Sequence, residues 1–258
     1  MRFKAVGVIP ARWGSTRFLG KPLHLIAGKP LLLHVWARCQ RARKLDTVII
    51  ATDDMRIAET AFAWGAEVAL TSAKHRSGTD RIAEVIRDAD EFTHVVNIQG
   101  DEPLVDAKLI DRLIRELERD RAVEMITAAH PFAVAADIAS PHQVKVVLDA
   151  EKNALYFSRS PIPFTRDPAA APPHLRHQGI YGYTRNLLLR FVRWKSSPLE
   201  GAESLEQLRA LENGVKIRVV VTGSGWPGVD TPADAKAVER QLAAEASASS
   251  RPPLRRAR

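Results

Sequence analysis

The sequence predicts an α/β fold: a mostly parallel, Rossmann-like sheet with helices on both faces and a smaller excursion beside it. Over the first half of the chain, short apolar runs alternate with segments in which apolar residues recur every three or four positions. The apolar runs are nearly continuous, which is typical of parallel strands buried on both faces. With 258 residues, 45% of them hydrophobic and 26% charged, the chain can form one large globular domain with ample core.

The first half supplies the centre of this sheet. The expected strands are residues 5–9, 47–51, 67–70, 94–98 and 124–129. The helices expected between them are residues 30–44, 57–64, 79–87 and 106–119. Ligands of such sheets gather at the carboxyl ends of the strands, so the loops expected to form a site are residues 10–22, 52–54 and 99–103.

After about residue 130 the alternation breaks, and five prolines between residues 161 and 173 indicate irregular chain. Strands are expected at residues 144–149 and 216–221, with further apolar segments at 154–159 and 179–183. The expected helices are residues 184–194, 198–212 and 232–245. We interpret residues 1–245 as a single domain, in which residues 132–194 form the excursion, and residues 246–258 as a disordered basic tail.

The expected helix at residues 184–194 is rich in large apolar side chains. It carries Leu187, Leu188, Leu189, Phe191, Val192 and Trp194. The proline-rich excursion and this helix together hold more apolar surface than one face can bury, so we expect a homodimer through this region.

The net charge of +8 is unevenly distributed along the chain. The last eight residues supply four of these charges, while the first 45 residues hold ten Lys or Arg and no Asp or Glu. A positive field of this kind suits a polyanionic ligand such as a nucleoside triphosphate. Nucleic acid is the rival partner, but the sequence has no RNP, helix-turn-helix or zinc pattern, which favours a nucleotide.

The sequence also indicates where the protein works. Its single cysteine, Cys39, cannot form an internal disulfide and is expected in the core. No run of 18 or more apolar residues occurs, and the chain enters its first strand directly, so we expect neither a membrane span nor a secretory signal. These features together indicate a cytoplasmic protein.

The stretch VIPARWGSTRFLGKPL, at the end of the first expected strand, has the composition of a phosphate-binding loop. Arg12, Arg17 and Lys21 can neutralise phosphates, and Gly14 and Gly20 let the backbone bend toward them. It is not a Walker A loop, because five residues separate the glycines and a proline follows the lysine; the dinucleotide fingerprint GxGxxG is also absent. The alternative is a solvated basic loop.

Eight sequence blocks, in order, carry a family resemblance: the first loop, ATDD, HRSGTDR, NIQGDEP, VKVVLDAE with ALYFSR, RHQGIYGY, SPLEGAESLEQLR and GVDTP. Over residues 4–240 they resemble the 3-deoxy-D-manno-octulosonate (Kdo) cytidylyltransferases. The resemblance implies a nucleotide-diphospho-sugar transferase fold, a homodimer, and transfer of CMP from CTP to the anomeric hydroxyl of Kdo for lipopolysaccharide biosynthesis. One departure is Leu19, where the family usually has proline. The alternatives are a cytidylyltransferase for another sugar acid, such as sialate, and a nucleic-acid-binding protein.

The reaction class calls for a metal ion, and Mg²⁺ prefers one or two carboxylates in addition to phosphates and waters. Asp101, just past the fourth expected strand, is the first candidate. The resemblance implies Asp230 as its partner, although by itself Asp230 would be a turn residue at a helix start. Asp53 is a weaker candidate, and Glu102 is expected to orient the loop.

Displacement at the α-phosphorus of CTP is catalysed largely by positioning and charge neutralisation, so Arg12 and Lys21 are the expected catalytic residues. The residues expected to bind the nucleotide are Ala11, Arg12, Ser15, Lys21, Ser77, Gly78, Thr79, Arg81 and Asp101. Ser77 or Thr79 could instead cap the following helix.

Kdo is itself an acid, so its site needs cations or polar donors. The resemblance implies that the sugar is bound by Arg17, Gln99, Arg159, His177, Tyr181 and Glu206. Read without the resemblance, His177 could be a surface histidine and Glu206 part of a solvated helix face.

Overall fold

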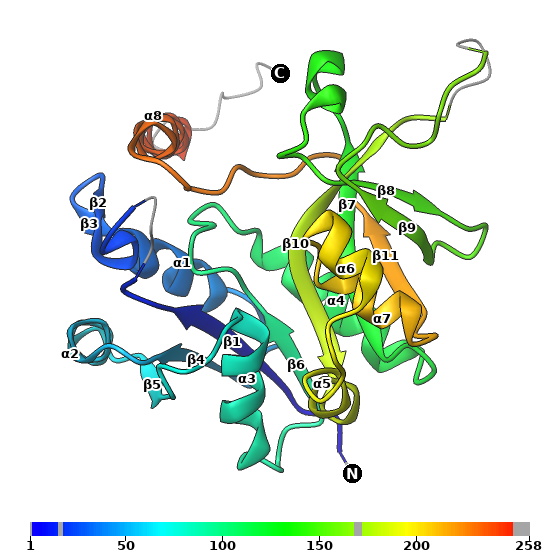
Figure 1. The fold of residues 1–258 in the computed structure, drawn as a ribbon. Helices are drawn as coiled ribbons and strands as arrows, with labels where there is room; N and C mark the ends of the chain where they lie inside the picture. Colours follow the sequence, from blue (N-terminus) through cyan, green and yellow to red (C-terminus); the bar gives the residue numbers. More distant parts are fainter. Residues whose placement is uncertain (1, 15–17, 168–171, 250–258) are drawn as a thin grey trace, which may run out of the picture.

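A nine-stranded sheet forms the centre of the described part of the chain, which is residues 2–14, 18–167 and 172–249 of a computed structural model (Figure 1). Seven strands follow the order β11-β7-β10-β6-β1-β4-β5, and β8 pairs with β10 and with β9. The strands are β1 (Ala5–Ala11), β4 (Thr47–Thr52), β5 (Glu67–Leu70), β6 (His94–Asn97), β7 (Met125–Pro131), β8 (Lys145–Leu148), β9 (Ala154–Ser158), β10 (Leu175–Thr184) and β11 (Ile217–Val221). A separate hairpin pairs β2 (Leu25–Ile26) with β3 (Lys29–Pro30).

The sheet is mostly parallel, as the sequence predicted. β1 pairs in parallel with β4 and β6, β4 with β5, and β11 with β7. In β1 every residue except Pro10 is buried, which explains its continuous apolar sequence. The parallel strands β1, β6 and β4 therefore bring the loops that follow them to one edge of the sheet.

Helices cover both faces of the sheet. They are α1 (Leu31–Cys39), α2 (Met55–Ala63), α3 (Gly78–Arg87), α4 (Ala107–Arg119), α5 (Arg185–Phe191), α6 (Pro198–Glu203), α7 (Gln207–Glu212) and α8 (Pro232–Ser249). Apolar side chains of α1, α2, α4 and α8 pack into one core cluster, and those of α3, α5 and α7 into the other. Two short 3₁₀ segments, η1 (Lys21–Leu23) and η2 (Ala135–Ala139), complete the described elements.

The helix starts agree closely with those predicted from apolar spacing, and polar side chains cap four of them. Asp54, Ser77, Asp106 and Thr184 accept hydrogen bonds of 3.0, 3.1, 2.9 and 3.2 Å from backbone N–H groups in the first turns of α2, α3, α4 and α5. These bonds satisfy N–H groups that have no partner inside the helix. The sequence therefore fixes each start to within two residues.

Several helix predictions were wrong in length, and the structure explains two of them. The helix expected at residues 30–44 ends at Cys39, which is fully buried and whose thiol pKa is raised by burial. The single helix expected at 198–212 is divided into α6 and α7 at Ser204, which has φ 51° in the left-handed region. The break allows Leu205 and Leu208 to enter the core, and Arg209 to pair with Glu200 at 2.5 Å.

Residues 132–194 are not an excursion as a whole. Strand β10 lies between β6 and β7, antiparallel to both, so this part of the segment is central to the sheet. Leu187, Leu188 and Phe191 of α5 are at most 1% exposed within the single chain. The expected excess of apolar surface is therefore absent from this helix, and the part of the dimer argument that rested on the helix was wrong.

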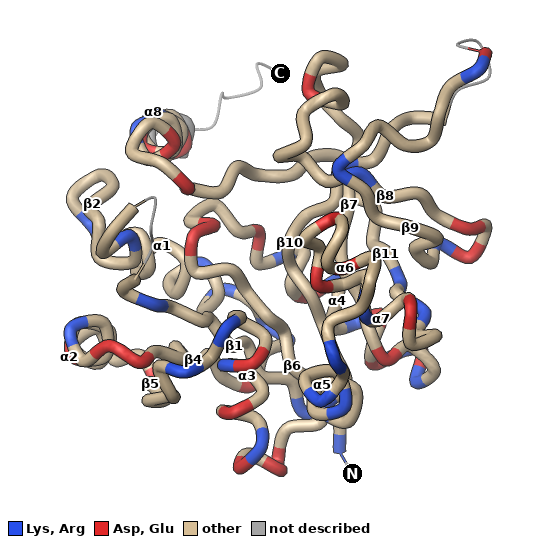
Figure 2. The backbone as a smooth tube through the Cα atoms, viewed as in Figure 1, with Lys and Arg blue, Asp and Glu red and all other residues tan. Residues whose placement is uncertain are grey.

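The closing helix is longer than expected. It reaches Ser249, so residues 246–249, which were assigned to the tail, are helical, while residues 250–258 lie outside the described part. α8 rests on the β2–β3 hairpin, where Glu239 accepts a 2.7 Å bond from the Ala27 backbone N–H (Figure 1). In the part of the chain that the structure describes, no helix is both long and apolar enough to span a membrane. Figure 2 shows Lys and Arg interspersed with Asp and Glu throughout the fold.

A glycine in the central strand β10 gives a stability test. A Cβ at Gly182 would lie 2.7 Å from Ile126 Cγ2 and 2.9 Å from Leu117 Cδ1. We expect Gly182→Ala to lower the free energy of unfolding by about 1–3 kcal/mol, because the core must move to admit the methyl group. Urea unfolding measures this change.

The matched control is Gly201→Ala in α6, where a Cβ would meet nothing within 4 Å. There we expect an increase of about 0.4–1 kcal/mol, because alanine restricts the unfolded chain. Equal effects of the two substitutions would contradict the packing described for β10.

Candidate active site

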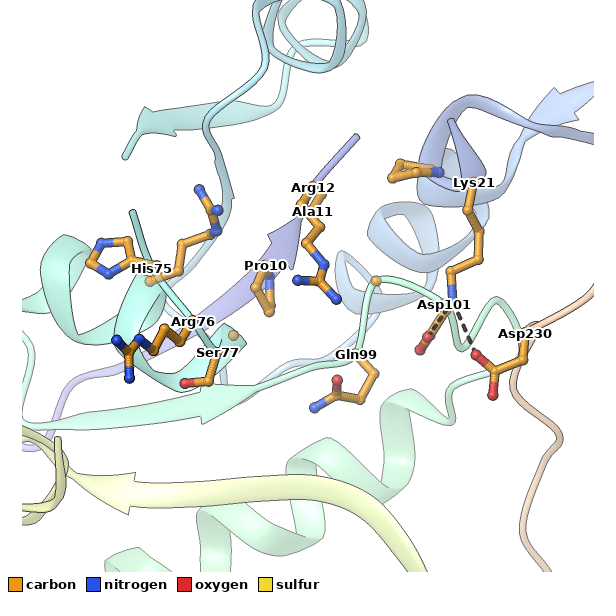
Figure 3. A pocket seen from close by; sticks show the side chains of 14 residues that line it. Pro10, Ala11, Arg12, Lys21, His75, Arg76, Ser77, Gln99, Asp101 and Asp230 are labelled. Carbon is orange, nitrogen blue, oxygen red and sulfur yellow. Dashed lines mark hydrogen bonds and ion pairs between the residues drawn. The ribbon is translucent and has the colours of Figure 1, made fainter. Parts of the chain in front are cut away.

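A cavity of about 290 Å³ opens at the edge of the sheet where β1 and β6 end (Figure 3). It is lined by Pro10, Ala11, Arg12, Lys21, Pro22, His75, Arg76, Ser77, Gly78, Arg81, Gln99, Gly100, Asp101 and Asp230. Two of the three loops that the sequence singled out, residues 10–22 and 99–103, line it. We call this cavity the first pocket.

The Lys21 ammonium lies between two carboxylates of the first pocket. Its Nζ donates to Asp101 Oδ2 at 2.7 Å and to the backbone carbonyl of Val229 at 2.9 Å, and it lies 3.5 Å from Asp230 Oδ1. The lysine side chain is only 15% exposed. Two carboxylates that are distant in sequence thus converge on one cation (Figure 3).

Close backbone contacts hold these three residues. Gly20, with φ 69°, precedes the short η1 segment, and a Cβ there would lie 3.0 Å from the Trp13 ring, so the chain turns tightly against Trp13 before Lys21. The Val229 N–H donates to the Asp101 carbonyl at 2.8 Å. The GVDTP and QGDEP segments are therefore bound to each other directly beside their acidic side chains.

The start of α3 forms the opposite wall of the first pocket. Ser77 caps the helix by accepting from the Asp80 N–H, so the capping interpretation is confirmed. Ser77 also lines the pocket with Gly78, and nucleotide binding by Ser77 stays a prediction. A capped helix N-terminus favours anions, because its backbone N–H groups carry partial positive charge.

Arg81 connects this wall to the loop at residues 52–54. It is 4% exposed, pairs with Asp53 at 3.2 Å and hydrogen-bonds the Thr71 hydroxyl. Asp53 is thus occupied by an arginine and does not line the first pocket, which weighs against it as a metal ligand.

Sequence reasoning missed two polar side chains that line the first pocket, His75 and Arg76. Both belong to the HRSGTDR block, and His75 is held by a hydrogen bond with Glu84. The signal was present: a histidine and an arginine directly precede a capped helix at a strand-end loop. In Figure 3 they lie on the side opposite Lys21 and Asp230, with Arg12 between the two groups.

A second pocket of about 110 Å³ adjoins the first and shares Gly78 and Gln99 with it. Its lining is completed by Thr79, Asn97, Tyr181, Tyr183, Phe191, Glu206 and Gln207. Thr79 donates to Glu206 Oε2 at 2.6 Å, and burial raises the pKa of the Glu206 carboxyl. The structure therefore brings together three residues expected on the sugar side, and it places Thr79 with them rather than in the first pocket.

Two other expected sugar residues, Arg159 and His177, line neither pocket. Arg159 donates to the carbonyls of Glu203, Pro141 and Ser204, at 2.7, 2.8 and 3.3 Å. His177 lies beside the Phe157 and Tyr181 rings, and burial, with a smaller effect of Arg176, lowers its pKa to about 3. The imidazole is therefore neutral at pH 7. Ser15 and Arg17 lie outside the described residues.

Asp101 and Glu102 are adjacent but face different surroundings. Asp101 lines the first pocket, whereas Glu102 lines neither pocket and is 8% exposed. Burial, together with the negative charge of Asp101, raises the pKa of Glu102 to about 7.

A metal ion at this site would rest on few protein ligands. Among the described residues, no group of three or more His, Cys, Asp and Glu side chains is arranged to hold a metal. Asp101 and Asp230 are the acidic residues that line the first pocket. Two carboxylates suit a hard cation that takes its remaining ligands from phosphates and water.

Comparison with known proteins agrees with this geometry. Residues 6–217 match the cytidylyltransferase family. A 3-deoxy-manno-octulosonate cytidylyltransferase from Syntrophobacter fumaroxidans is 51% identical over 246 residues, covering 94% of this chain and 98% of the relative. One from Solibacter usitatus is 49% identical over 237 residues, covering 92% and 94%.

Solved structures give the same result. The structure of CMP:2-keto-3-deoxy-manno-octonic acid synthetase complexed with CTP is 42% identical, with a TM-score of 0.91, and the match covers 94% of this chain and 99% of that one. A cytidylyltransferase from Leptospira borgpetersenii, at 17% identity and a TM-score of 0.65, shares the fold. The chain belongs to the 3-deoxy-manno-octulosonate cytidylyltransferase family.

Proposed function

We propose that the protein transfers CMP from CTP to the anomeric hydroxyl of Kdo and releases pyrophosphate, a step of lipopolysaccharide biosynthesis. The observation that carries this proposal is the pair of adjoining pockets: one has Lys21 between two carboxylates, and the other is lined by aromatic, amide and carboxyl groups. Membership of the family supports the same reaction, as does the CTP complex of the similar solved structure.

In this reaction the sugar oxygen forms a bond to the α-phosphorus, and the bond from that phosphorus to the bridging oxygen of pyrophosphate breaks. We assign Arg12 and Lys21 to the triphosphate, whose negative charge they neutralise. Arg76 and the start of α3 at Ser77 support the nucleotide from the opposite wall. The hydroxyl proton leaves to solvent.

Cytidylyltransferases generally use a divalent metal ion, and we propose Mg²⁺ held by Asp101 and Asp230. Support comes from the position of Lys21, because both carboxylates already face a common cation. When bound, the metal supplies Lewis acidity at the phosphate oxygens. The phosphates of CTP then offer Lys21 an anionic partner in place of the two carboxylates.

The second pocket fits a polyhydroxy sugar, because Gln99, Tyr181 and Glu206 offer donors and acceptors for hydroxyl groups. Arg17 is the proposed partner of the sugar carboxylate. We assign Arg159 and His177 to bracing this side from outside the pocket, since their described partners are backbone carbonyls, Thr127 and aromatic rings.

We propose a homodimer that works in the cytoplasm, where CTP is available. Its contact is formed by the segment between β7 and β10 rather than by α5. In this segment Phe164 is 89% exposed, Leu155 61% and Val134 54%. Exposed large apolar side chains favour a protein contact, and Phe164 is the most exposed of those in the described residues.

The proposal is tested by measuring pyrophosphate release with CTP, Mg²⁺ and a panel of sugar acids. We expect turnover with Kdo and at most a trace with sialate. Turnover with sialate in place of Kdo would instead indicate a cytidylyltransferase for that sugar acid. Replacing CTP by ATP, GTP or UTP should abolish most of the release. Binding of DNA or RNA that falls steeply with salt, without turnover of any sugar, would instead support the nucleic-acid alternative.

The metal assignment predicts severe loss of turnover in Asp101→Asn and Asp230→Asn, because a neutral amide holds Mg²⁺ poorly. We expect kcat to fall by about 100-fold or more with little change in thermal stability. Asp106→Asn is the matched control, since asparagine caps α4 as well as aspartate does. Turnover like that of the parent protein at limiting Mg²⁺ would refute the assignment.

The sugar assignment predicts that Glu206→Gln raises the KM for Kdo by roughly 10-fold or more, the cost of one charged hydrogen bond. The KM for CTP should stay within about two-fold, because Glu206 lines only the second pocket. Glu212→Gln, on the exposed end of α7, is the control. If the KM for CTP rose instead, the division into two pockets would be incorrect.

A further inference from the structure

Glu102 is a buried carboxyl group that the proposed reaction does not use. It lines neither pocket, and each of its oxygens accepts one side-chain hydrogen bond. Oε2 accepts from the Trp226 indole N–H at 2.7 Å, and Oε1 accepts from the Gln178 amide at 3.0 Å. A carboxyl group is costly to bury, so its retention in place of an apolar side chain calls for a role.

The two donors belong to different parts of the site. Trp226 lies in the segment that joins β11 to α8, and Asp230 follows it by four residues. Gln178 lies on β10, at the point where the pairing with β7 shifts register before Tyr181. One oxygen of Glu102 therefore fixes the segment of the second acidic residue, and the other fixes the strand that lines the second pocket.

Further contacts keep these segments in register. The Val229 N–H donates to the Asp101 carbonyl at 2.8 Å. The segment that carries Trp226 is therefore bound both to Glu102 and to its neighbour Asp101. A Cβ at Gly225 would overlap the His130 ring and come within 2.6 Å of the Gln178 amide oxygen, so this segment packs directly on β10. Trp226 itself is 8% exposed.

We propose that Glu102 is a positioning residue for both substrates. Through Trp226 it sets the position of Asp230 relative to Asp101, and through Gln178 it sets the position of Tyr181 in the second pocket. The inference rests on the proposed function, because it assigns metal binding to the two aspartates and sugar binding to the second pocket.

The role of Glu102 through Trp226 and its role through Gln178 can be separated by two variants, each of which removes one hydrogen-bond donor. Trp226→Phe keeps an aromatic ring and should raise the Mg²⁺ concentration for half-maximal activity roughly 10-fold, with the KM for Kdo within about two-fold. Gln178→Met should do the reverse, raising the KM for Kdo roughly 10-fold and leaving the Mg²⁺ requirement within about two-fold. Glu102→Leu, which removes both acceptors, should change both constants.

Glu102→Gln supplies the conservative rescue. The amide oxygen of a glutamine at this position can still accept from the Trp226 N–H. Its amide nitrogen can donate to the Gln178 amide oxygen if the Gln178 amide group rotates so that its oxygen faces position 102. Among the described residues, the Oε1 atom of Gln178 has no hydrogen-bond partner to lose. We therefore expect Glu102→Gln to stay within about three-fold of the parent in both constants.

A merely structural role is tested by Asp111→Asn. Asp111 is a buried carboxylate of α4 that accepts from the Lys44 N–H at 2.8 Å and lines neither pocket of the site. This variant should lower the melting temperature without moving either constant. If Trp226→Phe and Gln178→Met behave like Asp111→Asn, or if each changes both constants equally, the proposal is overturned.

A readout without turnover separates this inference from the proposed function. Binding of Mn²⁺ to the resting protein with CTP, followed by electron paramagnetic resonance, should weaken roughly 10-fold in Trp226→Phe and remain unchanged in Gln178→Met. Absence of Kdo turnover in the parent protein would refute the proposed function alone. Equal Mn²⁺ affinity in the parent and Trp226→Phe would refute the positioning role even if turnover is present.

Discussion

The contact between the Lys21 ammonium and the carboxylates of Asp101 and Asp230 is the interaction on which the site depends. Its partners lie 80 and 209 residues away from the lysine in sequence. Two carboxylates that lie so close together would repel each other without a cation between them. Lys21 therefore keeps the site assembled before any ligand arrives. Under the proposed function it would also make the site responsive to CTP, because the phosphates would compete with the carboxylates for the same ammonium group.

The sheet topology explains why these segments can meet. β1 and β6 are adjacent and parallel, so the loops that carry Lys21 and Asp101 leave the same edge. β10 runs antiparallel beside β6, which brings Tyr181 next to the residues that end β6. The two pockets consequently share Gln99 and Gly78. Under the proposed function, a nucleotide in the first pocket would therefore lie beside a sugar in the second.

Sequence reasoning succeeded where local chemistry decides the structure. Continuous apolar runs located the strands, the spacing of apolar residues located the helices, and the strand-end loop singled out Asp101. Asp54 and Ser77 cap two of these helices in the structure. It failed where distant contacts decide. The break at Ser204 serves the core beneath it, and the central place of β10 depends on pairing with β6 and β7.

The same distinction holds within the site. Locally, Asp230 resembles a residue at a helix start, so only the family resemblance could pair it with Asp101. Thr79 follows the pocket residue Gly78, but one step along a helix turns the side chain by about 100°, which carries it into the second pocket. The direction of such a side chain, and the contact of Glu102 with Trp226, can be seen only in the three-dimensional structure.

We propose that Asp101 and Asp230 exchange the Lys21 ammonium for a metal ion when CTP binds. A crystal structure with CTP and Mn²⁺, with the metal located by its anomalous scattering, tests this most directly. We expect Mn²⁺ bound to both carboxylates and to phosphate oxygens, with the Lys21 Nζ in contact with the triphosphate. Mn²⁺ bound elsewhere, or Lys21 still between the two aspartates with CTP in place, would contradict it.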